Sequence, residues 1–309
     1  MNPEQYRLSE TEHQRIFENR IKPVIFEDVT PTYNPVAVIF GGQPGSGKSA
    51  SLDVAIIELS GHGGSAQILG DDLRVYHPHH EFLMKQDDRT AAFYTDRDSG
   101  RWVEKAIDEA KKRNVNVVIE GTMRNSDVVA RTMRDFRMAG YEIDARAMAV
   151  SFRLSEQGIL QRYEGQRADR GFGRMTTPDA HQAAYEGMLR TLDRIEAEKL
   201  ADRLTIYRRG NLAIYSNELK YGLWVNEPGS RFAVEQERQR AMTLPELQSF
   251  VHAYDRLATL ISRPERKASA EEIQKIEGLR QRAASELKAR LEVQHGKEQR
   301  KPKEFDFGL

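Results

Sequence analysis

Short apolar runs alternate with amphipathic segments along most of the chain. Helical periodicity fills residues 50–59, 101–112 and 127–139, between apolar runs of four to seven residues. The runs that predict buried strands are residues 36–40, 66–69, 115–119, 144–150 and 203–207, with 212–216 as a further candidate. Such an alternation is typical of a mostly parallel sheet covered by helices on both faces. The pattern therefore predicts an α/β fold with a doubly wound sheet.

Helix-start signals mark the second half of the chain. Thr177 followed by Pro178 predicts a helix running towards residue 200, and Thr243 with Glu246 forms a capping-box pattern for a helix through residue 261. Ser269 opens a last helix with an apolar stripe of Ile273, Ile276, Leu279, Ala283, Leu287 and Leu291. This stripe favours packing on a neighbouring helix over a partner surface. A helix over residues 9–21 is also expected.

Composition excludes several classes of function. The 309 residues contain 47 basic and 47 acidic side chains, so no net field attracts nucleic acid or an anionic membrane. The absence of cysteine excludes disulfides, thiolate catalysis and zinc–thiolate sites. No apolar run is long enough to span a bilayer, and no secretory signal pattern is present. We expect a cytoplasmic protein without a membrane partner, and nucleic acid is disfavoured as a ligand.

The first predicted strand leads directly into a phosphate-binding loop. Residues 42–49 match the pattern G-x-x-x-x-G-K-[ST] in full, with a strand before and a helix after. Glycines let backbone N–H groups turn inward around phosphate oxygens at the start of the helix. Lys48 is expected on the β- and γ-phosphates, and Ser49 on Mg²⁺. The predicted ATP-binding residues are Gly42, Gln43, Pro44, Gly45, Ser46, Gly47, Lys48, Ser49 and Ala50.

Carboxylates follow two further strands at their carboxyl ends. Asp71 follows the strand at 66–69, and Glu120 ends the strand at 115–119. Ligands of open α/β sheets bind outside this edge, so Asp71 is a candidate general base and Glu120 a candidate for Mg²⁺ or a substrate hydroxyl. Capping of the next turn by Asp71 or Asp72, and pairing of Glu120 with Arg124, remain open alternatives. Glu104, on the following helix, is a further candidate.

A run of arginines predicts a mobile lid over the phosphates. Its members are Arg162, Arg167, Arg170 and Arg174, in a segment that glycines interrupt before Pro178. Guanidinium groups suit phosphate because their planar fork donates two hydrogen bonds and stays charged. A solvated basic helix is the alternative. The cluster of His77, His79 and His80 is a weaker metal candidate, because Pro78 interrupts it and no carboxylate pattern accompanies it.

Taken in order, these groups resemble the zeta toxin family, bacterial toxin kinases that phosphorylate UDP-N-acetylglucosamine. The resemblance covers about residues 35–209. The matching residues are 41–49, Asp71 with His77 and Pro78, the run 119–124, the run 162–164, and Arg174 leading into 178–181. The phosphate-binding loop is shared by many proteins, whereas the ordered combination with 120–122 and the late arginine and histidine is more specific. Ser49 stands where the family commonly has threonine.

The resemblance implies roles for individual residues. Catalysis would depend on Asp71 as the base for the sugar 3′-hydroxyl, with Lys48, Arg162 and Arg174 on the phosphates of ATP–Mg²⁺. The UDP-sugar would be held by Glu104, Glu120, Thr122 and Arg124. A kinase for another acceptor hydroxyl (another UDP-sugar, an antibiotic or a polynucleotide end) and an NTP-hydrolysing regulatory module remain alternatives.

The expected organisation has three parts. Residues 1–33 form an N-terminal helical arm, 34–240 a P-loop kinase domain, and 241–309 a C-terminal helical extension that ends in a frayed charged tail at 297–303. The extension lies beyond the core of the family. The resemblance also implies a small helical antitoxin as a protein partner, although the arm or the extension is an alternative source of restraint.

Overall fold

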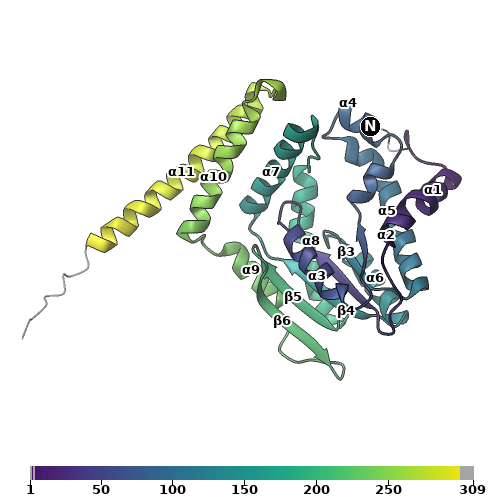
Figure 1. The fold of residues 1–309 in the computed structure, drawn as a ribbon. Coiled ribbons are helices and arrows are strands. Elements are labelled where there is room, and N and C mark those ends of the chain that lie inside the picture. The colour runs from purple at the N-terminus through teal and green to yellow at the C-terminus, as the bar shows by residue number, and fades with distance from the viewer. Residues whose placement is uncertain (1, 3, 300–309) are drawn as a thin grey trace, which may run out of the picture.

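A central sheet organises the structure, a computed structural model that describes residue 2 and residues 4–299 (Figure 1). Its strand order is β2-β3-β1-β4-β5-β6-β7. The pairs from β2 through β5 are parallel, and β6 and β7 are added antiparallel. The strands are β1 Val36–Gly41, β2 Ala66–Leu69, β3 Val117–Glu120, β4 Glu142–Met148, β5 Arg203–Arg208, β6 Leu212–Lys220 and β7 Leu223–Trp224. The predicted α/β class and the six predicted strands are confirmed, with ends shifted by up to four residues.

Helices connect the strands and cover the sheet. They are α1 Glu10–Ile16, α2 Lys22–Ile25, α3 Ser49–Ser60, α4 His80–Gln86, α5 Ala91–Arg113, α6 Ser126–Met138, α7 Phe152–Arg170, α8 Pro178–Ala197, α9 Ser230–Gln239, α10 Leu244–Ile261 and α11 Ala270–Gln299, with shorter turns η1 Phe17–Ile21, η2 Asp72–Tyr76 and η3 Pro264–Arg266. The sequence prediction missed α4, α7 and α9 and began α5 ten residues too late. Over the residues that the structure describes, no helix is apolar enough for long enough to cross a membrane.

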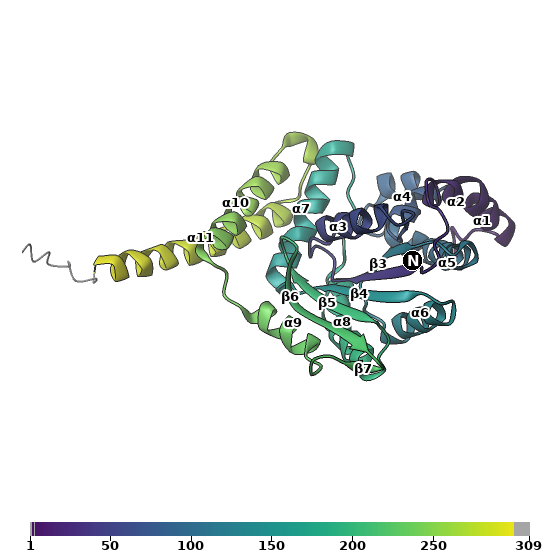
Figure 2. The same cartoon turned by 60° about the horizontal axis from the view of Figure 1, so that its bottom comes forward.

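Alternating residues of β1 face two different layers. Ala37 and Ile39 belong to the large core formed with α5, α6 and α8, whereas Val38 and Phe40 pack with Leu52 and other residues of α3. A strand that is apolar on both faces must be covered on both. Figure 2 shows the sheet between these two layers of helices.

The register of the parallel strands brings their carboxyl ends to one edge. Glu120, the last residue of β3, lies beside Phe40 of β1 and Leu69 of β2. The loops that follow β1, β2 and β3 therefore start from neighbouring points. This edge is where an open α/β sheet binds its ligands.

The N-terminal segment packs on the outer side of α5. Leu8, Ile16 and Ile21 are buried in the same core as the sheet. The indole N–H of Trp102 donates to the carbonyl oxygen of His13 at 3.1 Å, and the two rings stack at 4.8 Å. Residues 9–21 are helical as predicted, with a π-helical turn at the end.

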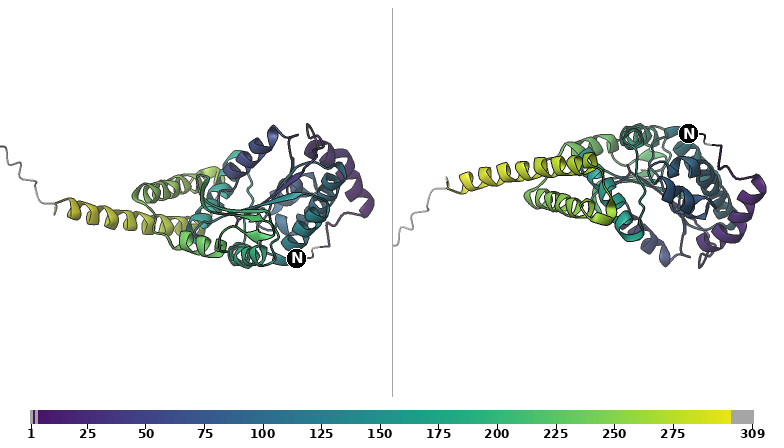
Figure 3. Two further views of the ribbon diagram at one scale, coloured as in Figure 1. Left: turned by 90° about the horizontal axis from the view of Figure 1, so that it is seen from below. Right: turned by 90° about the horizontal axis from the view of Figure 1, so that it is seen from above.

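The C-terminal helices form a hairpin against α7. α10 starts with the predicted capping box of Thr243 and Glu246, and it packs on both α7 and α11. Ile276 and Ala283 of the predicted stripe are buried against α10, whereas Ile273 is 40% exposed. Figure 3 shows α11 extending past α10 and away from the sheet. α11 runs to Gln299, and the remainder of the predicted charged tail, 300–303, lies outside the described residues.

Candidate active site

The loop between β1 and α3 has the backbone shape of an anion site. Gly45 and Gly47 have φ angles of +76° and +87°, a region that L side chains rarely adopt. α3 begins at Ser49 without a side-chain cap, so its first backbone N–H groups are free for a ligand. These features fit the phosphate-binding loop that the motif predicts.

Lys48 is buried beneath this loop. Its ammonium donates to the carbonyl oxygens of Gly42 at 2.8 Å and Gln43 at 3.4 Å, and it lies 3.2 Å from the carboxylate of Glu120. Burial lowers the pKa of Lys48, while the charges of Glu120 and Asp71 oppose that shift. Glu120 therefore pairs with Lys48, and the alternative pairing with Arg124 is not seen.

Hydrogen bonds with side chains outside the motif, those of Arg209 and Ser155, support the phosphate-binding loop, and the sequence analysis singled out neither residue. Arg209 donates to the carbonyl oxygens of Ser46 at 3.2 Å and Leu154 at 2.9 Å, and also to that of Gly45. Gln43 donates to Val150 at 2.7 Å and to Ser155 at 3.3 Å. The hydroxyl of Ser155 in turn contacts the ring of His181 at 2.8 Å. No local sequence pattern signals these contacts, because their partners are far apart in the chain.

Asp71 faces a cluster of guanidinium groups. Its carboxylate lies 2.5 Å from Arg174 and 3.4 Å from Arg74. Burial raises the pKa of Asp71, but the charges of Arg174, Arg74 and Arg162 outweigh it and hold the pKa below its usual value. Asp71 precedes η2 without making a side-chain cap, so the capping alternative does not hold.

Arg162 is a partly buried cation, and among the described residues no carboxylate is bonded to it. Its guanidinium donates to the hydroxyl of Thr176 at 2.9 Å, and its Nε has no partner within the part of the chain that the structure describes. Burial, together with the nearby charge of Arg174, lowers the pKa of Arg162 to about 10. Two guanidinium groups that repel one another at the mouth of a phosphate-binding loop are arranged for an anion. This burial also argues against the alternative of a solvated basic helix for α7.

Two cavities meet at Asp71 and Arg174. The first, of about 360 Å³, is lined by both residues together with Ser49, Glu120 and Arg162. The second, of about 600 Å³, is lined by both together with Pro44, Thr122, Arg124, Asp96 and Arg97. Of the expected ATP and phosphate residues, Ser49, Arg162 and Arg174 border the first space. Of the expected acceptor residues, Thr122 and Arg124 border the second space, whereas Glu120 borders the first. Arg170 also borders the first cavity and lies over the ring of Phe172, whereas Arg167 binds Asp88 instead.

Glu104 does not line either cavity. It is exposed on α5, whereas Asp96 and Arg97, two turns earlier on the same helix, border the second cavity. Eight residues of helix advance the chain by about 12 Å, which carries Glu104 away from the site. The role of Glu104 in acceptor binding remains a prediction. The sequence analysis began this helix near residue 101 and did not single out Asp96 or Arg97 as site residues.

Oxygen donors in the first cavity suit Mg²⁺. The hydroxyl of Ser49 and the carboxylates of Asp72 and Glu120 border the same space, and oxygen is the donor that Mg²⁺ prefers. Burial raises the pKa of Asp72, and the negative charges of Glu120 and Asp71 add to the shift. Among the described residues no group of three or more histidine or carboxylate side chains is arranged around a metal. His77 is buried instead, 3.1 Å from the carbonyl oxygen of Tyr6 and 3.4 Å from Asp98.

Comparison with known proteins agrees with this geometry. The model of the family described as Zeta toxin matches residues 23–220. The chain belongs to the zeta toxin family. Toxin zeta of Enterococcus hirae is 32% identical over 206 residues, which are 65% of this chain and 71% of that protein. Toxin PezT of Streptococcus pneumoniae is 28% identical over 185 residues, 60% of this chain and 72% of that protein.

Solved structures show the same fold. A structure from work on the PezAT chromosomal toxin–antitoxin system of Streptococcus pneumoniae superposes with a TM-score of 0.72 at 22% identity, over 84% of this chain and 100% of that chain. A structure of AvrRxo1-ORF1:-ORF2 with ATP gives a TM-score of 0.51 at 12% identity, over 91% of this chain and 87% of that chain. The zeta-type P-loop fold of this family member is therefore established from both sequence and structure.

Proposed function

We propose that this zeta-family chain is an ATP-dependent kinase that phosphorylates the 3′-hydroxyl of UDP-N-acetylglucosamine and acts as a bacterial toxin in the cytoplasm. One observation carries the proposal. Asp71 and Arg174 border both the cavity beside the phosphate-binding loop and the larger cavity next to it. A phosphoryl donor in the first space and an acceptor alcohol in the second would meet at these two side chains. All the proposed catalytic residues lie within the proposed kinase domain, 34–240.

Asp71 acts as the base in the proposed reaction. It orients the acceptor hydroxyl and accepts its proton while the acceptor oxygen forms a bond to the γ-phosphorus. At the same time the bond between the γ-phosphorus and the β–γ bridging oxygen breaks. ADP leaves with the electron pair of that bond. Arg162, Arg174 and Lys48 hold the phosphoryl oxygens through the transfer. Mg²⁺, held by Ser49 and the neighbouring carboxylates, would neutralise charge on the phosphates.

The acceptor is proposed from family membership and from the shape of the second cavity. Thr122 and Arg124 border that space with Asp96 and Arg97, which gives it hydroxyl, carboxylate and guanidinium groups for a sugar nucleotide. Loss of this precursor would slow cell-wall synthesis. A small antitoxin protein is proposed as a partner, because PezT belongs to a system that is described as toxin–antitoxin.

Mass spectrometry of nucleotide sugars after incubation with ATP and Mg²⁺ tests the proposal. We expect one added phosphate on UDP-N-acetylglucosamine. Asp71→Asn should abolish this product and keep ATP binding, whereas Asp108→Asn, at an exposed position on α5, should retain full activity. Phosphate on a different acceptor in a panel would change the substrate assignment. ATP hydrolysis with every acceptor left unmodified would favour the regulatory module.

A further inference from the structure

A buried ion pair joins the C-terminal hairpin to α7. Arg266, in the turn between α10 and α11, donates to Glu164 through Nε at 2.7 Å and through Nη2 at 3.0 Å. The two side chains are only 7% and 4% exposed. Both partners are thus removed from water, in a two-point geometry that fixes their relative orientation.

Glu272 of α11 completes the hairpin side of this contact. Its carboxylate accepts from the guanidinium of Arg266 at 2.8 Å and from the backbone N–H of Ser269 at 2.8 Å, and it also pairs with Arg89. Burial raises the pKa of Glu272, but these donors lower it to about 2. The hairpin therefore holds both α7 and the corner between α4 and α5 that contains Arg89.

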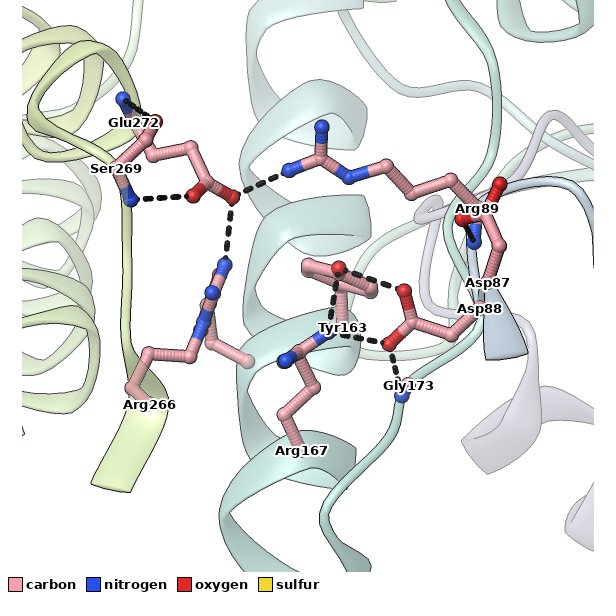
Figure 4. Close-up of polar contacts among 10 residues, drawn as sticks. Asp87, Asp88, Arg89, Tyr163, Arg167, Gly173, Arg266, Ser269 and Glu272 are labelled. Carbon is pink, nitrogen blue, oxygen red and sulfur yellow. Dashed lines mark hydrogen bonds and ion pairs between the residues drawn. The ribbon is translucent and has the colours of Figure 1, made fainter. Parts of the chain in front are cut away.

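The same corner holds the segment that follows α7. Asp88 accepts from the hydroxyl of Tyr163 at 3.0 Å, from Arg167 at 2.6 Å and from the backbone N–H of Gly173 at 2.9 Å (Figure 4). Gly173 packs so closely that an added Cβ would lie 2.3 Å from the carbonyl oxygen of Tyr163. Figure 4 shows this cluster and the hairpin contact on neighbouring sides of α7.

These contacts end next to the two arginines of the proposed site. Arg162 directly precedes Tyr163 on α7, and Arg174 directly follows Gly173. The guanidinium of Arg266 also lies over the ring of Tyr163, 5.7 Å from its centre. A displacement of α7 by loss of the Arg266 contact would move Arg162 with its helix and Arg174 with the segment after it.

Stability alone does not account for this arrangement. A buried ion pair gives little net stability relative to a well-packed apolar pair, whereas it fixes orientation. The hairpin residues involved also lie outside the span 23–220 that matches the family model. The contact thus joins a segment beyond the family model's span to the part that carries the proposed site.

We propose that Arg266 is a positioning residue, through which the C-terminal hairpin sets the placement of Arg162 and Arg174. The inference rests on the proposed function, because it assigns a role to those arginines in phosphoryl transfer. Since they act on the transferring phosphoryl group, misplacement should lower kcat more than it raises KM for ATP.

The test compares Arg266→Met and Arg266→Lys with Arg280→Met in the full chain. Arg280 pairs with Asp255 of α10 at 2.7 Å, so this ion pair lies within the hairpin and does not involve α7. The side chain of Arg280 is 43% exposed. We expect Arg266→Met to lower kcat about tenfold or more, while KM for ATP changes by less than about threefold. Arg266→Lys should recover part of the lost kcat. Arg280→Met should have the kcat of the wild type. Equal kcat in Arg266→Met and Arg280→Met would overturn the proposal.

A second measurement is independent of the acceptor. Hydrogen exchange of residues 171–177 should be about tenfold faster in Arg266→Met than in Arg280→Met, and unchanged exchange would count against the proposal. The exchange rate separates the positioning role of Arg266 from the proposed kinase function, because it tests the positioning role even when the wild type phosphorylates no acceptor. If Arg266→Met fails to fold, the double variant Glu164→Gln with Arg266→Met removes both buried charges. A low kcat in that folded double variant supports the positioning role of Arg266. A kcat equal to that of the wild type refutes the role.

Discussion

The carboxylate of Asp71 and the guanidinium of Arg174 lie 2.5 Å apart in the wall shared by the two cavities. Each group is the ion-pair partner of the other in the free protein. A phosphate bound beside Arg174 would compete for its guanidinium, and the carboxylate would then face the second cavity without its partner. The ion pair thus links anion binding to the availability of the proposed base.

The pH dependence of activity follows from this pair. The pKa of Asp71 lies below the 3.8 of an ordinary aspartate because nearby arginines outweigh burial. Asp71 must be deprotonated to act as a base, so kcat/KM should hold as pH falls and decline only below that value. Removing Arg174 takes away the largest cationic contribution and should raise the pKa.

We therefore expect Arg174→Met, besides being slower, to show the acid decline of kcat/KM at a higher pH than the wild type. A pH–rate profile from about pH 3 to 8 measures the shift. Circular dichroism at each pH controls for unfolding. An acid limb at the same pH in both proteins would contradict the assignment of Asp71 as the base.

Arg162 is expected to act mainly in the transition state. With a pKa of about 10, it keeps its charge at neutral pH although it is partly buried. Arg162→Lys preserves a charge but loses the planar fork that donates to Thr176 and that would also donate to a phosphate oxygen in the proposed mechanism. We expect kcat to fall on the order of 10²-fold. Arg153→Lys, which changes an exposed arginine on the same helix, should lower kcat by less than about twofold. A similar loss of kcat in both variants would remove Arg162 from the proposed mechanism.

Local signals explain what the sequence predicted well. The capping box of Thr243 and Glu246 fixes the start of α10, because both of its hydrogen bonds span only three residues. The phosphate-binding loop is likewise one continuous motif between a strand and a helix. The roles of Lys48, Asp71, Arg162 and Arg174 remain proposals, but their convergence at one edge follows from the order of parallel strands.

Other features depend on contacts that no local pattern encodes. The residue before α5, Thr90, makes no side-chain cap, so the start of that helix has no clear signal and the prediction began it ten residues too late. α7 contacts the phosphate-binding loop, the hairpin and the Asp88 corner on different sides, so it lacks a single apolar stripe. The pair of Glu164 and Arg266 spans 102 residues.

Two glycines on α7 should respond in opposite ways to alanine. A Cβ on Gly158 would lie 2.2 Å from the carbonyl oxygen of Gly45, whereas Gly165 has no atom within 4 Å of its added Cβ. Gly158→Ala should push α7 off the phosphate-binding loop, weaken ATP binding about tenfold and destabilise the fold by roughly 1–3 kcal/mol. Gly165→Ala should stabilise it by about 0.5–1 kcal/mol, because alanine favours the helix. Calorimetry of ATP binding and thermal unfolding measures both, and equal effects would show that the close approach has no role.

The second cavity gives a matched pair of carboxylates on α5. Asp96 borders that cavity and lies 2.5 Å from Arg74, which itself lies 3.4 Å from Asp71, whereas Glu104 is exposed and borders neither cavity. Asp96→Asn should therefore raise KM for the acceptor several-fold, with a smaller change in KM for ATP, because the cavity loses a charge that also orients Arg74. Glu104→Gln should leave both constants unchanged within twofold. Steady-state kinetics with the acceptor varied at saturating ATP measures the difference. A larger effect from Glu104→Gln than from Asp96→Asn would mean that the acceptor binds along the outer part of α5, and the second cavity would lose its assignment.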